Sequence, residues 1–140
     1  MRHRVYGKHL GRNKNQRTAL FKNLVRSLLL SETIETTETK AKAIKGLVDK
    51  IINQAKSKNT QRLVSQFLTD KKVLEKLIKD ITPRVSDRIS GYTSVVRLGR
   101  RLGDGGMMVR MSLLMSPSVP TDSSPKAQND KIKKITKKAK

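Results

Sequence analysis

Apolar residues in the first part of the chain recur with two different periods. Within residues 18–30 they lie three and four positions apart, which is the period of one face of an α-helix. Asn15 or Thr18 is expected to cap this helix. Residues 33–37 are β-branched and alternating, so they predict a short strand. The apolar face predicted for the helix consists of Leu20, Phe21, Leu24, Val25, Leu28 and Leu29.

A second amphipathic helix is expected after this strand. Thr37 or Thr39 is a suitable cap, and the pattern continues to about Lys58. Its predicted core face is Ile44, Leu47, Val48, Ile51, Ile52 and Ala55, and its polar face carries Lys40, Lys42, Lys45, Lys50 and Lys56. These lysines either contact a polyanion or form a solvated face, and both interpretations stay open.

Two shorter helices are predicted next, with Asn59 and Asp70 as their caps. Pro83 is expected to end the second one, because proline lacks the backbone N–H that a helix interior requires. The apolar positions are Leu63, Val64, Phe67 and Leu68 in the first, and Val73, Leu74, Leu77, Ile78 and Ile81 in the second.

The last ordered segment is predicted to be a β-hairpin. Residues 91–98 alternate, which places Tyr92, Ser94, Val96 and Leu98 on one face, and residues 107–115 form a second apolar strand. The glycine-rich residues 99–106 between them predict a tip that carries Arg100 and Arg101. Val96 and Val109 are expected to pack against the helices, and Met107, Met108, Met111 and Met115 to fill the core.

The element order predicts an α+β fold in which helices pack on one face of a small three-stranded sheet. This domain is expected to span residues 18–115. An extended basic arm, residues 1–17, precedes it. Residues 116–140 contain almost no aliphatic side chains and many Ser, Pro and Lys, so they predict a disordered, Lys-rich tail.

The charge of the chain predicts a polyanionic partner. There are 32 Lys and Arg against 11 Asp and Glu, a formal net charge of +21. Both ends are basic and free of acidic residues over residues 1–17 and 131–140. Neither end forms the amphipathic helix with large apolar side chains that an anionic membrane surface requires, and no apolar run approaches the roughly 20 residues of a membrane span. We therefore expect a soluble intracellular protein that binds nucleic acid, with no membrane insertion.

The chain offers little for catalysis. It has no cysteine, and its two histidines, His3 and His9, lie in the basic arm with no carboxylate nearby in sequence to orient them. The glycine-rich tip lacks the Gly-Lys-Ser/Thr ending of a P-loop and precedes a strand rather than a helix. We expect no enzymatic activity, no cofactor or metal and no small-molecule substrate.

The arm has the composition of a segment that follows folded RNA. Its cations are interleaved with Tyr6, His3 and His9, which can stack on exposed bases, and with small or polar residues. A solvated leader would need neither the aromatic residue nor the preference for arginine. RNA contact is therefore the favoured interpretation of the arm.

Several dispersed motifs resemble a known family. They are Met1-Arg2-His3-Arg4, the turn at residues 7–10 with Arg12, the helix start at residues 17–23, residues 34–37 followed by Lys40-Ala41-Lys42, Pro83-Arg84, Arg88, Gly91-Tyr92-Thr93 and the tip at residues 101–105. Over residues 1–115 the chain resembles the family of bacterial large-subunit ribosomal protein number seventeen. Two positions depart from its usual pattern: Thr39 stands where the family often has proline, and Ser94 where arginine is common, so an RNA contact at position 94 is in doubt.

The resemblance implies a structural constituent of the large ribosomal subunit in the cytoplasm, bound to 23S rRNA near the polypeptide exit and next to other large-subunit proteins. A DNA-binding nucleoid-type protein is the alternative, and a small basic RNA nuclease is the third possibility. The candidate RNA-binding residues are Arg2, His3, Arg4, Tyr6, Lys8, His9, Arg12, Lys14, Arg17, Lys22, Lys40, Lys42, Arg84, Arg88, Tyr92, Arg100 and Arg101.

Overall fold

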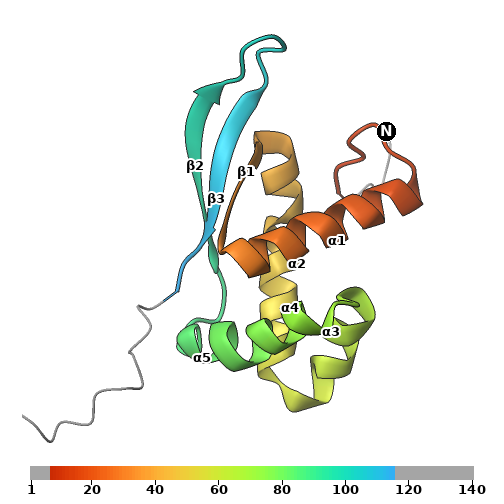
Figure 1. The fold of residues 1–140 in the computed structure, drawn as a ribbon, viewed down its shortest axis with the longest axis vertical. Coiled ribbons are helices and arrows are strands. Elements are labelled where there is room, and N and C mark those ends of the chain that lie inside the picture. The colour runs from red at the N-terminus through yellow and green to blue at the C-terminus, as the bar shows by residue number, and fades with distance from the viewer. Residues whose placement is uncertain (1–6, 116–140) are drawn as a thin grey trace, which may run out of the picture.

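The fold alternates one long helix, one strand, a second long helix, a series of short helices and a hairpin (Figure 1). A computed structural model describes residues 7–115. The elements are α1 (Lys14–Ser31), β1 (Thr33–Thr37), α2 (Glu38–Lys56), the 3-10 turn η1 (Lys58–Thr60), α3 (Gln61–Phe67), α4 (Lys71–Lys76), the π-helical turn η2 (Leu77–Ile81), α5 (Thr82–Arg84), β2 (Thr93–Arg100) and β3 (Met107–Leu113). The expected α+β class is confirmed.

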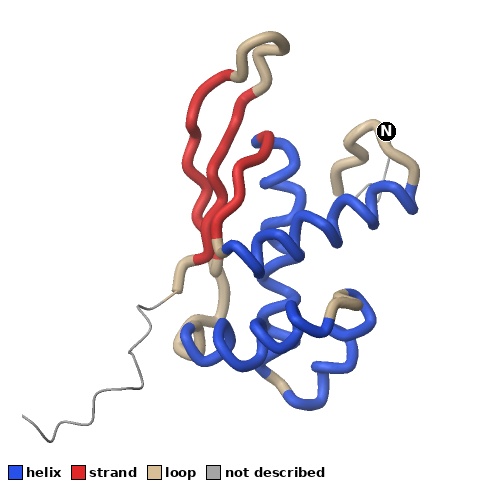
Figure 2. Tube along the Cα trace, in the orientation of Figure 1, coloured by secondary structure: helices blue, strands red, loops and turns tan. Residues whose placement is uncertain are grey.

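The three strands form one antiparallel sheet in the order β1-β3-β2, with β3 in the centre. Helix α2 contacts all three strands. The helices lie on one side of the sheet, and the β2–β3 hairpin reaches beyond them (Figure 2). The expectation of helices on one face of a three-stranded sheet is therefore confirmed.

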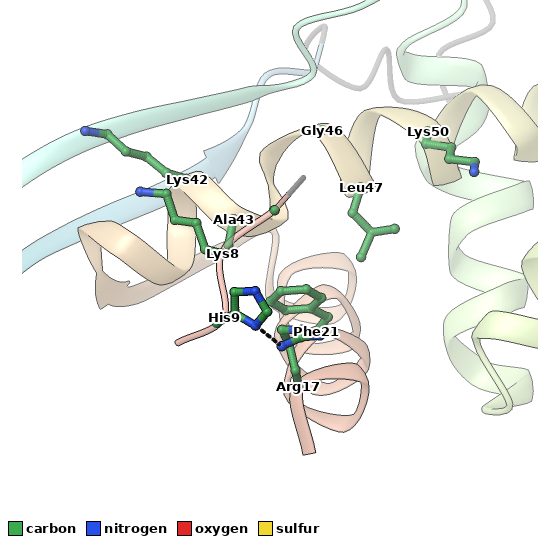
Figure 3. A pocket seen from close by; sticks show the side chains of 10 residues that line it. Lys8, His9, Arg17, Phe21, Lys42, Ala43, Gly46, Leu47 and Lys50 are labelled. Carbon is green, nitrogen blue, oxygen red and sulfur yellow. Dashed lines mark hydrogen bonds between the residues drawn. The ribbon is translucent and has the colours of Figure 1, made fainter. Parts of the chain in front are cut away.

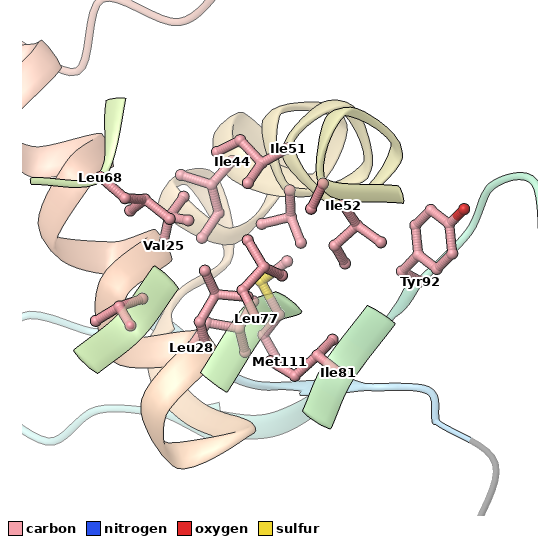
Figure 4. Packing of buried hydrophobic residues seen from close by; sticks show 14 of the residues in the cluster. Val25, Leu28, Ile44, Ile51, Ile52, Leu68, Leu77, Ile81, Tyr92 and Met111 are labelled. Atoms are coloured by element: carbon pink, nitrogen blue, oxygen red, sulfur yellow. The ribbon is translucent and has the colours of Figure 1, made fainter. Parts of the chain in front are cut away.

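The core forms where α1, α2, the α4–η2 segment and β3 meet (Figure 4). Met111 on β3 is fully buried among them, and Val109 is buried on the same strand. Both long helices bury much of the face that their periodicity predicts, namely Val25, Leu28, Leu29, Ile44, Val48, Ile51, Ile52 and Ala55. At the margin of this core, Phe21, Leu24 and Leu47 are only half-buried. Leu20 is also half-buried but is not packed against the core.

The hairpin turns a different face inward from the one expected. Val95 pairs with Met111 and packs against the core, whereas Val96 is 56% and Leu98 46% exposed. Successive side chains of a strand point to opposite faces, so a half-buried Val95 that faces the core places Val96 on the outer face, which no helix of the described residues covers. The expected packing of Val96 is therefore wrong, and that of Val109 is confirmed.

Helix α1 begins at Lys14 rather than at residue 18, and its cap is Asn13 rather than Asn15 or Thr18. The backbone N–H of Asn13 donates to the Gln16 side chain at 3.4 Å. Before it, the Arg12 N–H donates to the His9 carbonyl at 3.2 Å and closes a turn. Of the expected extended arm, residues 7–13 thus form a loop with this turn and residues 14–17 are helical. Residues 1–6 and the expected tail, residues 116–140, lie outside the described part.

Pro83 does not end the helical segment as expected, because it lies inside the last turn, α5. The turn before it is widened to a π-helix, in which the Thr82 N–H donates to the Leu77 carbonyl. The Thr82 hydroxyl donates to the same carbonyl at 2.7 Å. A regular α-helix would bring the proline ring against a carbonyl of the preceding turn, and the wider turn relieves this contact.

Candidate nucleic-acid interface

A basic cleft opens where the N-terminal turn meets α1 and α2 (Figure 3). Its volume is about 660 Å³. The lining residues are Gly7, Lys8, His9, Arg17, Phe21, Lys42, Ala43, Gly46, Leu47 and Lys50. Four of them are Lys or Arg and none is acidic, so the cleft attracts anions.

Arg17 fastens the turn to α1. Its guanidinium lies 3.2 Å from Nδ1 of His9 and donates to the Arg12 carbonyl at 3.3 Å. Arginine has only donors, so Nδ1 of His9 accepts in this contact and Nε2 carries the ring N–H. Lys8 and His9 are thereby held beside the helix at the mouth of the cleft (Figure 3).

The inner wall of the cleft is apolar and comes from both long helices. Phe21 follows Arg17 by four positions on α1, and Ala43 and Leu47 are four apart on α2, so each pair shares one helical face. Gly46 lies between them, and a Cβ added there meets no atom of residues 7–115 within 4 Å. Within this part of the chain, the space above Gly46 is therefore open.

Glu38 in the first turn of α2 holds Lys42 at the edge of the cleft. The Lys42 ammonium lies 2.8 Å and the Arg97 guanidinium 2.9 Å from its Oε1. Hydrogen bonds from Lys42 and then Arg97 lower the pKa of Glu38 from 4.5 to about 2. Glu38 is thus ionised at neutral pH and ties β2 to the start of α2.

The hairpin tip carries two arginines, of which Arg101 is paired with an acidic residue and Arg100 is not within residues 7–115. Arg101 donates through Nε to Asp104 at 3.0 Å, and this contact holds the pKa of Asp104 well below its usual range and raises that of Arg101. Arg100 is exposed and forms no ion pair within residues 7–115. The tip lies apart from the N-terminal turn (Figure 1).

Three expected RNA-binding side chains have contacts inside the protein. Tyr92, a candidate RNA-binding residue, is fully buried, so the structure does not leave its ring accessible to RNA. Arg84 lies 3.4 Å from Glu32 and 3.5 Å from Asp80, with its side chain 22% exposed. The Lys22 ammonium lies 5.7 Å from the centre of the Phe67 ring. The family-like motifs at these positions therefore also serve the fold.

The cleft unites Lys8, His9, Arg17 and Lys42 from the expected set. Arg12, Lys14 and Arg88 are exposed elsewhere, Lys40 is half-buried in the first turn of α2, and Arg2, His3, Arg4 and Tyr6 lie outside the described residues. Sequence reasoning missed the cleft roles of Phe21, Gly46, Leu47 and Lys50. The available signal was Gly46, because a glycine inside a helix costs about 1 kcal/mol relative to alanine.

Among the described residues, no group of three or more His, Asp and Glu side chains is arranged to hold a metal ion. No helix in the same part of the chain has the length and apolar character of a membrane span.

Comparison with known proteins gives one consistent result. Residues 20–114 match the family described as Ribosomal protein L17. A large ribosomal subunit protein bL17 from Sulfurihydrogenibium sp. (strain YO3AOP1) is 45% identical over 121 residues, which cover 84% of this chain and 100% of the relative. The protein of the same name from Thermodesulfovibrio yellowstonii is 44% identical over 74% of this chain and 80% of its own length. That from Koribacter versatilis is 45% identical over 85% of this chain and 75% of its own length.

Proposed function

Because the chain belongs to the Ribosomal protein L17 family, a non-enzymatic family of the large ribosomal subunit, we propose that it binds 23S rRNA through its basic cleft. In this proposal the protein lies near the polypeptide exit, beside other large-subunit proteins, and stabilises the folded rRNA during assembly and translation. The hairpin cation Arg100 provides a second contact point.

One observation carries the proposal: cations from three separate elements line one cleft. Lys8 comes from the N-terminal turn, Arg17 from α1, and Lys42 and Lys50 from α2. Within residues 7–115, only Lys42 of these four has an acidic partner. Each phosphate that such a cation neutralises releases counterions, so affinity for RNA should fall steeply as salt rises.

The cations place the protein on the RNA rather than read its sequence. Phosphate contacts from Lys and Arg fix position and orientation but carry little sequence information. RNA phosphates that contact the cleft from the turn side and from the α2 side would be held at a fixed separation. This is the mechanism by which we expect the protein to stabilise the rRNA fold.

The test compares two variants that each lose three charges. The first variant changes Lys8, Lys42 and Lys50 to Gln. The second makes the same change at the exposed Lys58 on η1 and at Lys71 and Lys72 on α4, none of which lines the cleft. Binding of the full chain to a 23S rRNA fragment is titrated at several salt concentrations. The cleft variant should bind more weakly. The salt slope, which is the slope of the logarithm of the binding constant against the logarithm of the salt concentration, should become shallower by roughly 0.7 to 0.9 per phosphate contact removed.

The control variant should keep most of the parent's affinity and slope. Equal losses in the two variants would contradict a specific cleft, since only net charge would then matter. Binding of duplex DNA as tightly as the rRNA fragment would instead favour a DNA-binding protein.

A further inference from the structure

We propose that the cleft takes in one unstacked nucleotide of the RNA, with its base against the apolar wall and its flanking phosphates on the cations at the rim. This inference rests on the proposed rRNA binding and adds a defined ligand to it. It concerns the shape and the apolar lining of the cleft, whereas the proposal above concerns its charge.

The first argument is that phosphate binding alone needs no apolar concavity. A purely electrostatic site requires exposed cations on any surface, yet this cleft has Phe21, Ala43 and Leu47 in its lining. Its volume of about 660 Å³ lies within the range typical of pockets that enclose small organic ligands. Proteins bind single-stranded RNA by stacking splayed bases on aromatic side chains, and half-buried Phe21 presents such a ring.

The second argument is the arrangement of polar groups around that wall. Lys8 and Lys42 extend their ammonium groups in the same direction on one side of the cleft, and Lys50 lies on the other side (Figure 3). The His9 ring lies beside Phe21, with Nδ1 occupied by Arg17. Nε2–H of His9 is then the donor left for an acceptor on the base or the ribose. Cations on two sides of an apolar wall match a base with a phosphate on each side.

The third argument is Gly46, which keeps the wall open. It lies in the middle of α2 and is exposed, where alanine or leucine would favour the helix by up to about 1 kcal/mol. Its helical backbone needs no left-handed conformation, and no atom of the described residues lies within 4 Å of an added Cβ. The only effect of a larger side chain visible in the described residues is to fill the cleft.

The test is therefore Gly46→Leu, which fills the cleft without changing any charge. Binding of the full chain to a 23S rRNA fragment should weaken by about tenfold, a loss comparable with that of one stacked base. The salt slope should stay at the parent's value, because the phosphate contacts remain. The matched control is Gln66→Leu, which adds the same side chain at an exposed position of α3 and should bind like the parent.

Parental affinity in G46L would overturn the nucleotide proposal. The proposed rRNA binding would survive that result if the Lys8, Lys42 and Lys50 variant still lost affinity and slope. Weaker binding with a flatter salt slope would also overturn the nucleotide proposal, since phosphate contacts would then account for the loss. If G46L lowers the melting temperature, G46Q replaces it, because a glutamine fills the same space with a polar end.

Discussion

The hydroxyl of Tyr92 lies 2.5 Å from Oδ1 of Asn53 and 2.8 Å from the Arg88 carbonyl. At the other end of the same residue, the Tyr92 backbone N–H donates to Asp49 at 3.1 Å. Asp49 and Asn53 are one turn apart on α2, so a single helical face fixes the segment that enters β2. The Lys56 ammonium lies 4.9 Å from the centre of the Tyr92 ring and covers it.

Tyr92→Phe should therefore destabilise the protein by about 1 kcal/mol, the usual net value of one buried hydrogen bond. Urea denaturation of the two proteins measures this difference. RNA affinity should not change, because the ring is buried. A clear loss of RNA affinity at unchanged stability would show that the hydroxyl contacts RNA.

Val109 and Val96 provide a matched pair on the two hairpin strands. Val109→Asp places a charge in the core and should lower the free energy of unfolding by more than about 3 kcal/mol. Val96→Asp changes a side chain that is 56% exposed and should lower the free energy of unfolding by less than about 1 kcal/mol. Urea denaturation of both variants checks the order, and similar losses in the two would contradict the strand register described above.

Gly46→Ala should stabilise the protein by about 0.5 to 1 kcal/mol, because alanine favours the helix and its Cβ meets no described residue there. Thermal melting measures the gain. Gly91→Ala is the contrasting variant: its φ of +71° is a left-handed conformation, so the same change should be destabilising there. A Gly46→Ala variant that melted below the parent would mean that the helix is strained at this position.

The Glu38 carboxyl should titrate with a pKa of about 2 in the folded protein. Because this pKa is lowered from 4.5, the stabilising contribution is complete above about pH 4.5 and is lost as the pH falls toward 2. NMR titration of the side-chain carboxyl gives the value directly. Arg97→Gln removes one of the two cations, so the pKa should rise while Lys42 keeps it below 4.5. A value of 4.5 in the parent would contradict the two contacts.

The helices were predictable because apolar residues at the helical period mark the face that packs on the core. Ile44, Val48 and Ile52 on α2 recur at the spacing of one helical face and are fully buried. The strand period tells only which residues share a face. It groups Ser94, Val96 and Leu98 but does not say whether the core or the solvent lies on that side, which depends on where the helices pack.

The cleft could not be predicted because it exists only when three elements meet. Phe21 and Leu47 fit the helical pattern of core residues, and periodicity does not distinguish a core residue from one at the margin. Lys50 belongs to a lysine-rich face for which sequence favoured neither RNA nor solvent. Lys8 and His9 lie against α1 because Arg17 contacts the N-terminal turn. This contact is tertiary, so the sequence pattern does not predict it.

Chemical modification of lysines in assembled large subunits tests the central claim most directly. Lys8, Lys42 and Lys50 are compared between the free protein and the same protein in the subunit, with modification rates read by mass spectrometry. Binding of the cleft to rRNA predicts that all three react several-fold more slowly in the subunit, and that washing at high salt short of dissociation reduces this protection. Equal modification rates of the three lysines in the free and the assembled protein would contradict the account.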